Sequence, residues 1–259
     1  MKQSIFLTIA ILATAIVAFS IYFLVLGDPG NFLNGDARTK PANLLGTVYT
    51  GGWVVPILIT LTLLDLTLVF ERVFSLRKAN GKQTITLFLK SVQSQLNNGR
   101  IDDAIKSCDA QRGSAANIIR TGLERYKSVA TEAKLDAEKK MAETQRAIEE
   151  ATSLETPLLE RNLIALSTIA SIATMFGLLG TVIGMIRSFT ALARAGAPDS
   201  IQLSIGISEA LINTALGLIA AIVGIVAYNF FVTKVDNFTY MIDEASYNVV
   251  QILNTRTNN

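Results

Sequence analysis

Two long apolar runs, residues 162–187 and 203–232, stand back to back in the last third of the chain. A short polar loop, residues 188–202, separates them. Each run is long enough to cross a hydrocarbon core, which takes roughly 20 helical residues. The pattern therefore predicts a hairpin of two transmembrane helices.

Two further apolar runs lie nearer the N-terminus. The first, Ile5 to Leu26, is longer than the apolar core of a signal peptide, so we expect residues 1–27 to form an uncleaved transmembrane helix rather than a leader. Residues 28–52 are rich in Gly, Asn and Asp and predict a loop. The second run, residues 53–71, predicts another transmembrane helix, which stops at Glu71-Arg72.

The intervening segment, residues 72–161, is polar and has helical periodicity. Its short predicted helices are Thr84–Leu96, Ile101–Ala110 and Ser114–Tyr126. A longer helix is predicted from about Thr131, and its alternating charges are typical of a solvated face. Since only Pro157 interrupts the pattern before the next apolar run, we expect one long helix, bent at that proline, to rise into the membrane.

The tail, residues 233–259, is amphipathic. Its apolar residues at steps of three and four are Val235, Phe238, Ile242, Ala245 and Val249. We expect the tail to continue the last transmembrane helix and to pack against the polar segment.

The distribution of basic residues predicts how the chain is oriented in the membrane. Those that flank the polar segment are Arg72, Arg77, Lys78 and Arg161, and the loops on the other side hold few. This places residues 72–161 in the cytoplasm and residues 28–52 and 188–202 in the periplasm. Both termini are then cytoplasmic. The whole pattern predicts an all-α polytopic membrane protein with about four transmembrane helices and a cytoplasmic helical module, with long helices running from the membrane into the cytoplasm.

The composition of the chain excludes several classes of function. Half of the residues are apolar and 17% are charged, which is typical of a membrane protein with one polar module. The chain has no histidine, which excludes a His-ligated metal, a Ser-His-Asp triad and a histidine proton relay, and its single cysteine, Cys108, cannot form an internal disulfide. No nucleotide loop or nucleophile–base pair is visible, so we expect neither an enzyme nor a cofactor. A net charge of +2 without an Arg-aromatic patch does not indicate nucleic acid binding.

Polar residues interrupt the last apolar run. Glu209 lies roughly 9 Å below its outer end at 1.5 Å per residue, and Asn213 follows one turn deeper on nearly the same face. Thr214 points about 140° away from Glu209, so the two cannot both face one axis squarely. A carboxylate within a membrane span is costly and is a functional candidate. Arg187 and Arg194 are its cationic neighbours in the sequence.

Asp65 interrupts the second apolar run. It is either a structural carboxylate near the inner boundary, hydrogen-bonded to a neighbouring helix, or a group that takes part in conduction. We favour the structural interpretation.

Two motifs resemble a known family. Residues 177–189, GLLGTVIGMIRSF, and residues 206–218, GISEALINTALGL, are similar to signatures of the MotA/TolQ/ExbB proton-channel proteins, closest to the ExbB/TolQ branch. The resemblance covers about Trp53 to Phe231. It implies a bacterial inner-membrane ring, usually of five subunits, whose last two spans line a pore. A single-span partner similar to ExbD or TolR lies in that pore and carries the proton on an aspartate. A transducer similar to TonB or TolA receives the energy.

The resemblance also implies roles for individual residues. Thr181 and Thr214 match the family's pore-lining hydroxyls, and Glu209 matches its glutamate. Thr174 stands where the family usually has proline, and Asn213 stands where alanine is common. The N-terminal span is additional to the three-span members, and nothing in the sequence assigns it a role.

Structural alternatives stay open beside these assignments. Glu209 either gates access to the partner's aspartate or is hydrogen-bonded between subunits. Thr181 and Thr214 either carry a proton through hydroxyls and water or let helices pack closely. The glycines expected to serve packing are Gly177, Gly180, Gly184, Gly217 and Gly224.

The leading functional hypothesis is an ExbB-like proton-channel subunit that powers outer-membrane import through a TonB-like transducer. A TolQ-like role in envelope maintenance and a motility stator are alternatives within the same family. From other classes come a small-solute transporter, for which no internal repeat is found, and a passive membrane scaffold.

Overall fold

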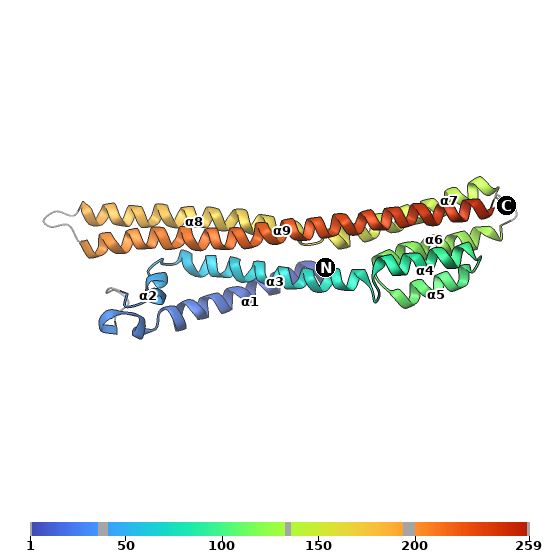
Figure 1. Cartoon of the computed structure of the whole chain (residues 1–259). Coiled ribbons are helices and arrows are strands. Elements are labelled where there is room, and N and C mark those ends of the chain that lie inside the picture. The colour runs from blue at the N-terminus through green and yellow to red at the C-terminus, as the bar shows by residue number, and fades with distance from the viewer. Residues whose placement is uncertain (1, 36–40, 133–135, 194–199, 258–259) are drawn as a thin grey trace. The chain divides into compact units, whose positions relative to one another are not determined.

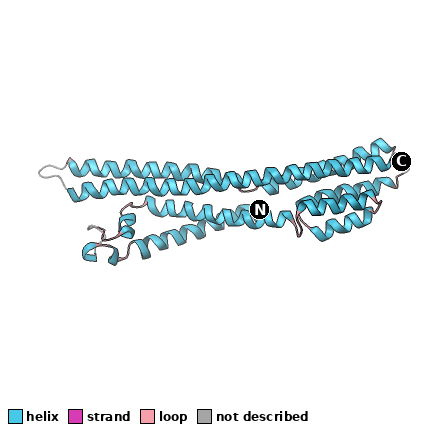
Figure 2. Cartoon of the chain, in the orientation of Figure 1, coloured by secondary structure: helices cyan, strands magenta, loops and turns pink. Residues whose placement is uncertain are grey.

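The computed structural model describes residues 2–35, 41–132, 136–193 and 200–257, and these residues are almost entirely helical (Figures 1 and 2). The first part of the chain forms α1 (Lys2–Ser20), the π-helical turn η1 (Ile21–Leu26), the short turns η2 (Pro29–Asn31) and η3 (Leu33–Gly35), and α2 (Leu44–Tyr49). Then follow α3 (Val54–Asn80), α4 (Ile85–Asn97), α5 (Ile101–Gln111), α6 (Ser114–Ala130), α7 (Ala137–Glu160), α8 (Leu163–Leu192) and α9 (Ser200–Thr257). In the described ranges the only β pairing is a bridge between Phe32 and Pro41. The all-α prediction is confirmed.

The chain divides into two compact units. The apolar unit comprises Met1–Phe70 and Asn162–Asn229, and the polar unit comprises Glu71–Arg161 and Phe230–Asn259. Helices α3 and α9 each contribute residues to both units.

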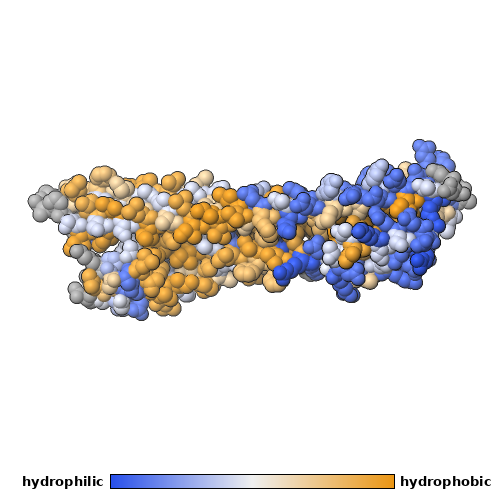
Figure 3. Space-filling view, in the orientation of Figure 1, coloured by the Kyte–Doolittle hydropathy of each residue, from blue (hydrophilic) through white to orange (hydrophobic). Residues whose placement is uncertain are grey.

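The surface of the apolar unit is suited to contact with lipid. Among the described residues, four helical stretches are long and apolar enough to cross a membrane, the first being Ile5–Leu26 and the others including α3, α8 and α9. Large apolar side chains on these helices face outward, where they form the orange surface in Figure 3. Examples are Ile16, Leu24, Phe70, Ile164, Val182, Leu211 and Ile222. A continuous apolar surface of this kind marks a membrane-facing protein, and the chain is a polytopic membrane protein.

The polar unit has its own hydrophobic core. Successive helices from α4 to α7 contact one another, and the end of α9 packs into the same core. Its buried members include Phe88, Val92, Leu96, Cys108, Ile119, Leu123, Met141, Ala245, Val249 and Leu253. The predicted packing of the amphipathic tail against the polar segment is thus confirmed. Burial in this core raises the pKa of the Cys108 thiol to about 12, so it stays protonated at neutral pH.

The helix boundaries follow the breakers in the sequence. Helix α4 ends before Gly99, whose φ of 77° lies in the left-handed region that glycine adopts without steric cost. The predicted break after α5 also holds, because Arg112 and Gly113 both have positive φ. Helix α7 begins later than predicted, at Ala137, where the Asp136 carboxylate accepts a hydrogen bond from Lys139 N at 2.8 Å.

The prediction of one long helix bent at Pro157 is wrong. Helix α7 ends at Glu160 and α8 begins at Leu163, while Pro157 stays inside the last turns of α7. The break comes from Asn162, which has φ 61°. Asparagine is among the few residues other than glycine that visit the left-handed region readily, and that conformation cannot continue a right-handed helix.

Candidate functional site

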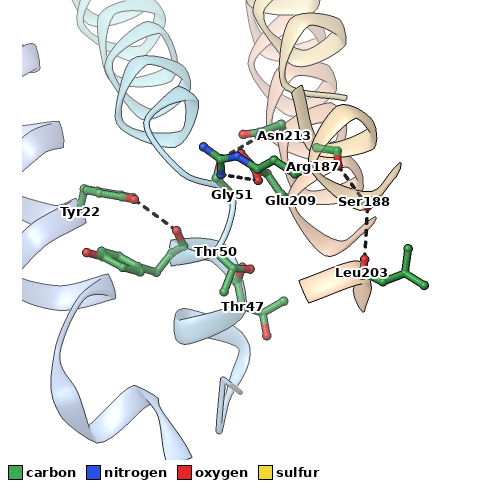
Figure 4. A network of polar contacts seen from close by, with 11 residues as sticks. Tyr22, Thr47, Thr50, Gly51, Arg187, Ser188, Leu203, Glu209 and Asn213 are labelled. Atoms are coloured by element: carbon green, nitrogen blue, oxygen red, sulfur yellow. Dashed lines mark hydrogen bonds and ion pairs between the residues drawn. The ribbon is translucent and has the colours of Figure 1, made fainter. Parts of the chain in front are cut away.

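The site is centred on an ion pair between α8 and α9. Arg187 of α8 donates from Nη1 to Glu209 Oε2 of α9 at 2.6 Å (Figure 4). The Glu209 side chain is 0% exposed, whereas that of Arg187 is 53% exposed. A buried carboxylate is tolerated when a charge-assisted hydrogen bond compensates its lost hydration. Arg187 supplies that bond from within the same chain. The other cation considered in the sequence, Arg194, lies outside the described residues.

A glycine turn between α2 and α3 covers Glu209. Gly52 has φ 73°, and a Cβ atom placed on it would lie 2.9 Å from Glu209 Oε1. Just before it, the Gly51 carbonyl accepts a hydrogen bond of 2.8 Å from Asn213 Nδ2 (Figure 4). Asn213 is itself 0% exposed. Glu209 and Asn213, one turn apart on α9, therefore both face this turn.

The N-terminal helical segment holds the glycine turn in place. Tyr22 of η1 stacks on Tyr49 of α2, with ring centroids 4.6 Å apart and planes 17° apart. The Tyr22 hydroxyl also donates to the Tyr49 carbonyl at 3.2 Å (Figure 4). Tyr22, Leu26 and Val55 form a buried cluster against which Ile212 of α9 packs. The segment for which the sequence offered no role thus lies beside the Glu209 site.

Two oxygens of the site have no hydrogen-bond donor within the described part of the chain. They are Glu209 Oε1 and Asn213 Oδ1, and both are buried. An unpaired buried acceptor costs free energy, and because both side chains are 0% exposed, a donor from outside the chain reaches these oxygens only if the Gly51–Gly52 turn moves away.

Thr181 and Thr214 form a second polar group, separate from Glu209. Their hydroxyls are hydrogen-bonded to each other across α8 and α9. Thr181 Oγ1 also lies 3.1 Å from the Gly177 carbonyl oxygen, and Thr214 Oγ1 lies 3.2 Å from the Ala210 carbonyl oxygen. Because each hydroxyl has one hydrogen, one of the two donates to the other, and the second donates to the carbonyl of its own helix. Both threonines are partly exposed. The structure brings Thr181 and Thr214 together and groups Glu209 with Asn213.

Small residues let α8 and α9 approach closely along their length. A Cβ atom on Gly217 would lie 2.8 Å from the Cα of Gly177, so these backbones are in direct contact. A Cβ atom on Gly184 would lie 2.6 Å from Ala210 N. Gly180 lies against the Asn213 side chain. This close approach of α8 and α9 lets Arg187 reach Glu209 and lets Thr181 reach Thr214.

Asp65 differs from its predicted environment. It is 0% exposed in α3 and lies beside Gly224 of α9, where a Cβ atom would be 3.0 Å from Asp65 Oδ2. The expected hydrogen bond to a neighbouring helix is not found, because neither carboxyl oxygen has a partner in the described ranges. The helix that approaches Asp65 presents a glycine there, which offers no side-chain donor.

Several residues of the site were not identified from the sequence. In the sequence, Gly51 and Gly52 indicate only a loop, and Tyr22 and Tyr49 lie within a predicted span and a predicted loop. A Gly-Gly pair directly before an apolar run was the one available signal of a close backbone approach. The glutamate that it contacts lies far away in the sequence.

Comparisons with known proteins agree with the motifs. The model of the MotA/TolQ/ExbB proton channel family matches residues 110–244. The Tol-Pal system protein TolQ of Pseudomonas aeruginosa is 31% identical over 164 residues, which are 63% of this chain and 70% of that protein. The biopolymer transport protein ExbB of Aquifex aeolicus is 34% identical over 117 residues, 45% of this chain and 71% of that protein. The ExbB of Pseudomonas putida is 39% identical over 88 residues, which are only 27% of its length.

Substitution of the glycine turn tests its contact with Glu209. We expect Gly52→Ala to lower the melting temperature of the detergent-solubilised protein more than Gly35→Ala does. Both glycines have positive φ, 73° and 71°, so both variants carry a similar backbone strain of about 1–2 kcal/mol. Only at Gly52 does the new methyl group meet Glu209, since a Cβ atom on Gly35 has no neighbour closer than 4.0 Å. Equal losses in the two variants would show that the turn does not press on the carboxylate.

Proposed function

Because the chain belongs to the MotA/TolQ/ExbB proton channel family, and within it to the ExbB/TolQ branch, we propose that it is an ExbB-like subunit of an inner-membrane proton channel. In this proposal the channel couples the proton-motive force to a TonB-like transducer and so energises import across the outer membrane. The chain supplies the channel wall and no enzymatic chemistry.

The proposed assembly is a pentameric ring. Helices α8 and α9 line its pore, and an ExbD/TolR-like single-span protein in the pore carries the proton on its aspartate. The proposed division of the chain is an N-terminal span (1–27), a periplasmic loop (28–52), a span (53–71), a cytoplasmic module (72–161), a pore span (162–187), a periplasmic loop (188–202), a pore span (203–232) and a cytoplasmic tail (233–259). The basic residues around the polar unit support this orientation, with both termini in the cytoplasm.

The observation that carries the proposal is the hydroxyl pair of Thr181 and Thr214. A hydroxyl can accept one hydrogen bond while donating another, so a pair of them can pass a proton between water and a carboxylate. These hydroxyls come from both pore helices and are partly exposed. We therefore assign the proton pathway to the Thr181–Thr214 side of the hairpin.

Glu209 has a different role in this proposal. Its own chain covers it, through Arg187 on one side and Gly52 on the other. It therefore acts by holding Arg187, whose side chain is half-exposed and can meet a partner chain. In this role Glu209 and Asn213 belong to the pore mouth and position charge there.

A TolQ-like role is the second candidate. The P. aeruginosa protein that aligns with 63% of this chain is a Tol-Pal system protein. In that case the partner would be TolR-like, the transducer TolA-like, and the function envelope maintenance.

Affinity purification of the full-length chain in mild detergent tests the assembly. We expect a homo-oligomeric ring that retains a small single-span protein with an acidic residue in its span. The identity of the co-purified transducer, TonB-like or TolA-like, separates the two candidate functions. Isolation as a monomer without such a companion would contradict both.

Removal of the hydroxyls tests the pathway. We expect the double variant Thr181→Val and Thr214→Val to lower proton-driven uptake at least about tenfold, because a positioned proton-transfer group contributes about 10²–10⁴-fold. The double variant with serine at both positions keeps the hydroxyls and should retain most of the activity.

Thr190→Val is the matched control for this experiment. Thr190 lies on α8, its hydroxyl donates to the Ile186 carbonyl at 2.8 Å, and its side chain is exposed. This variant should transport normally. If the double valine variant assembled and also transported like the unmodified protein, the hydroxyl pathway would be wrong.

A further inference from the structure

Asp65 lies where three helices of the apolar unit meet. It projects from α3 and is 0% exposed. A Cβ atom on Gly224 of α9 would lie 3.0 Å from Asp65 Oδ2, 3.0 Å from the Ala170 methyl group and 3.1 Å from the Leu166 carbonyl. The carboxyl group is therefore enclosed by α3, α8 and α9 of its own chain.

Nothing in the described part of the chain compensates a charge on this group. Neither Asp65 oxygen has a hydrogen-bond partner, and none of the ion pairs there includes Asp65. An isolated carboxylate in an apolar environment costs far more free energy than the neutral acid. In this packing the carboxyl group must hold a proton.

Neighbouring titratable groups do not change this conclusion. The α8 and α9 residues packed here, Leu166, Ala170 and Gly224, carry no titratable side chain. The next titratable position along α9 is Tyr228, and the next ones along α3 are Glu71 and Arg72, which pair with each other at 2.6 Å. A cation from another subunit or from lipid cannot reach Asp65 unless α3 separates from α8 and α9, because the chain already covers it completely.

We propose that Asp65 is a proton-binding site of this chain, which holds its proton while α3 packs on α8 and α9 and releases it only when these helices separate. The ligand is a single proton, and ionisation requires water or a cationic group to enter between the helices. Proton release and helix separation are then thermodynamically linked, since each favours the other. Asp65 itself lies outside the region 110–244 that matches the family, whereas the α8 and α9 residues that enclose it lie within that region. Asp65 is also distinct from the carboxylate expected on the partner.

Infrared spectroscopy tests whether Asp65 is protonated. The full-length chain, with the proteins that co-purify, is reconstituted in lipid vesicles at neutral pH. We expect the difference between the unmodified protein and Asp65→Asn to contain the carbonyl band of a protonated carboxyl group. Asp236→Asn, which changes an exposed aspartate of α9, should remove no such band. Absence of the band from the unmodified protein at neutral pH would overturn the proposal.

Isotope labelling covers the case in which Asp65→Asn does not assemble. This chain alone is expressed with heavy carbon in the side-chain carboxyl group of aspartate and is combined with unlabelled partner proteins, so that an aspartate of a partner keeps its band position. The Asp65 band should shift in this sample. A protonated-carboxyl band that does not shift would come from another residue type or from a partner and would count against Asp65.

Exchange in heavy water tests the link to helix packing. We expect the Asp65 band to change slowly to its deuterated position in the unmodified protein, and faster in Gly224→Ala, whose methyl group forces α9 away from Asp65 and Ala170. Ile225→Ala, on an exposed position of the same helix, should exchange as slowly as the unmodified protein. Exchange as fast as that of a surface carboxyl group would refute the link. Neither infrared measurement requires transport, so a failure here is distinct from a failure of the proposed function.

Discussion

The ion pair between Glu209 and Arg187 is the interaction on which the arrangement of the hairpin depends. A carboxylate that is 0% exposed needs a compensating donor, and the donor stands on the neighbouring helix, 2.6 Å away. This reach is possible because α8 and α9 are separated by little more than their backbones at Gly177 and Gly217. The small residues between α8 and α9 therefore bring Arg187 within contact distance of Glu209.

The N-terminal segment takes part in burying this ion pair. Glu209 is buried because the Gly51–Gly52 turn lies on it, and the turn is held by Asn213 from α9 and by the stacked rings of Tyr22 and Tyr49. An alanine at position 213 could not make the 2.8 Å hydrogen bond that Asn213 makes to Gly51. The amide and the N-terminal segment are thus two parts of one local arrangement.

Glu209 and Asp65, the two acidic residues within the predicted spans, differ in how the cost of burying a carboxyl group is compensated. Glu209 is compensated by a cation and keeps one oxygen free in a polar neighbourhood. Asp65 has no such partner among the described residues and lies against glycine and alanine. The first acid is suited to positioning the Arg187 side chain, and the second is suited to exchanging a proton when the packing changes.

The sequence predicted the local features well. Helical periodicity predicted the helices and the buried face of the tail, because the side chains that face a core recur every three to four residues. The predicted helix Thr84–Leu96 corresponds to α4, Ile85–Asn97, to within one residue at each end. The break at Asn162 was missed because the proline close by was the stronger signal, although proline is tolerated there within α7.

Contacts between distant segments could not be predicted in the same way. Helical geometry indicated that Glu209 and Thr214 face different directions, and the structure groups them with different partners. It could not show that Thr181 meets Thr214, since the relative register of two helices depends on their packing. The contact of Gly52 with Glu209 joins segments far apart in the chain, and no local pattern encodes it.

The most direct test of this account is a double-mutant cycle on the central ion pair. Unfolding of the assembled protein is measured for Arg187→Met, Glu209→Gln and the double variant. The account predicts that Arg187→Met costs about 3–5 kcal/mol, because it leaves a buried carboxylate unpaired, and that the double variant costs clearly less than the sum of the single ones. Additive losses would mean that the two residues act independently and would contradict the account.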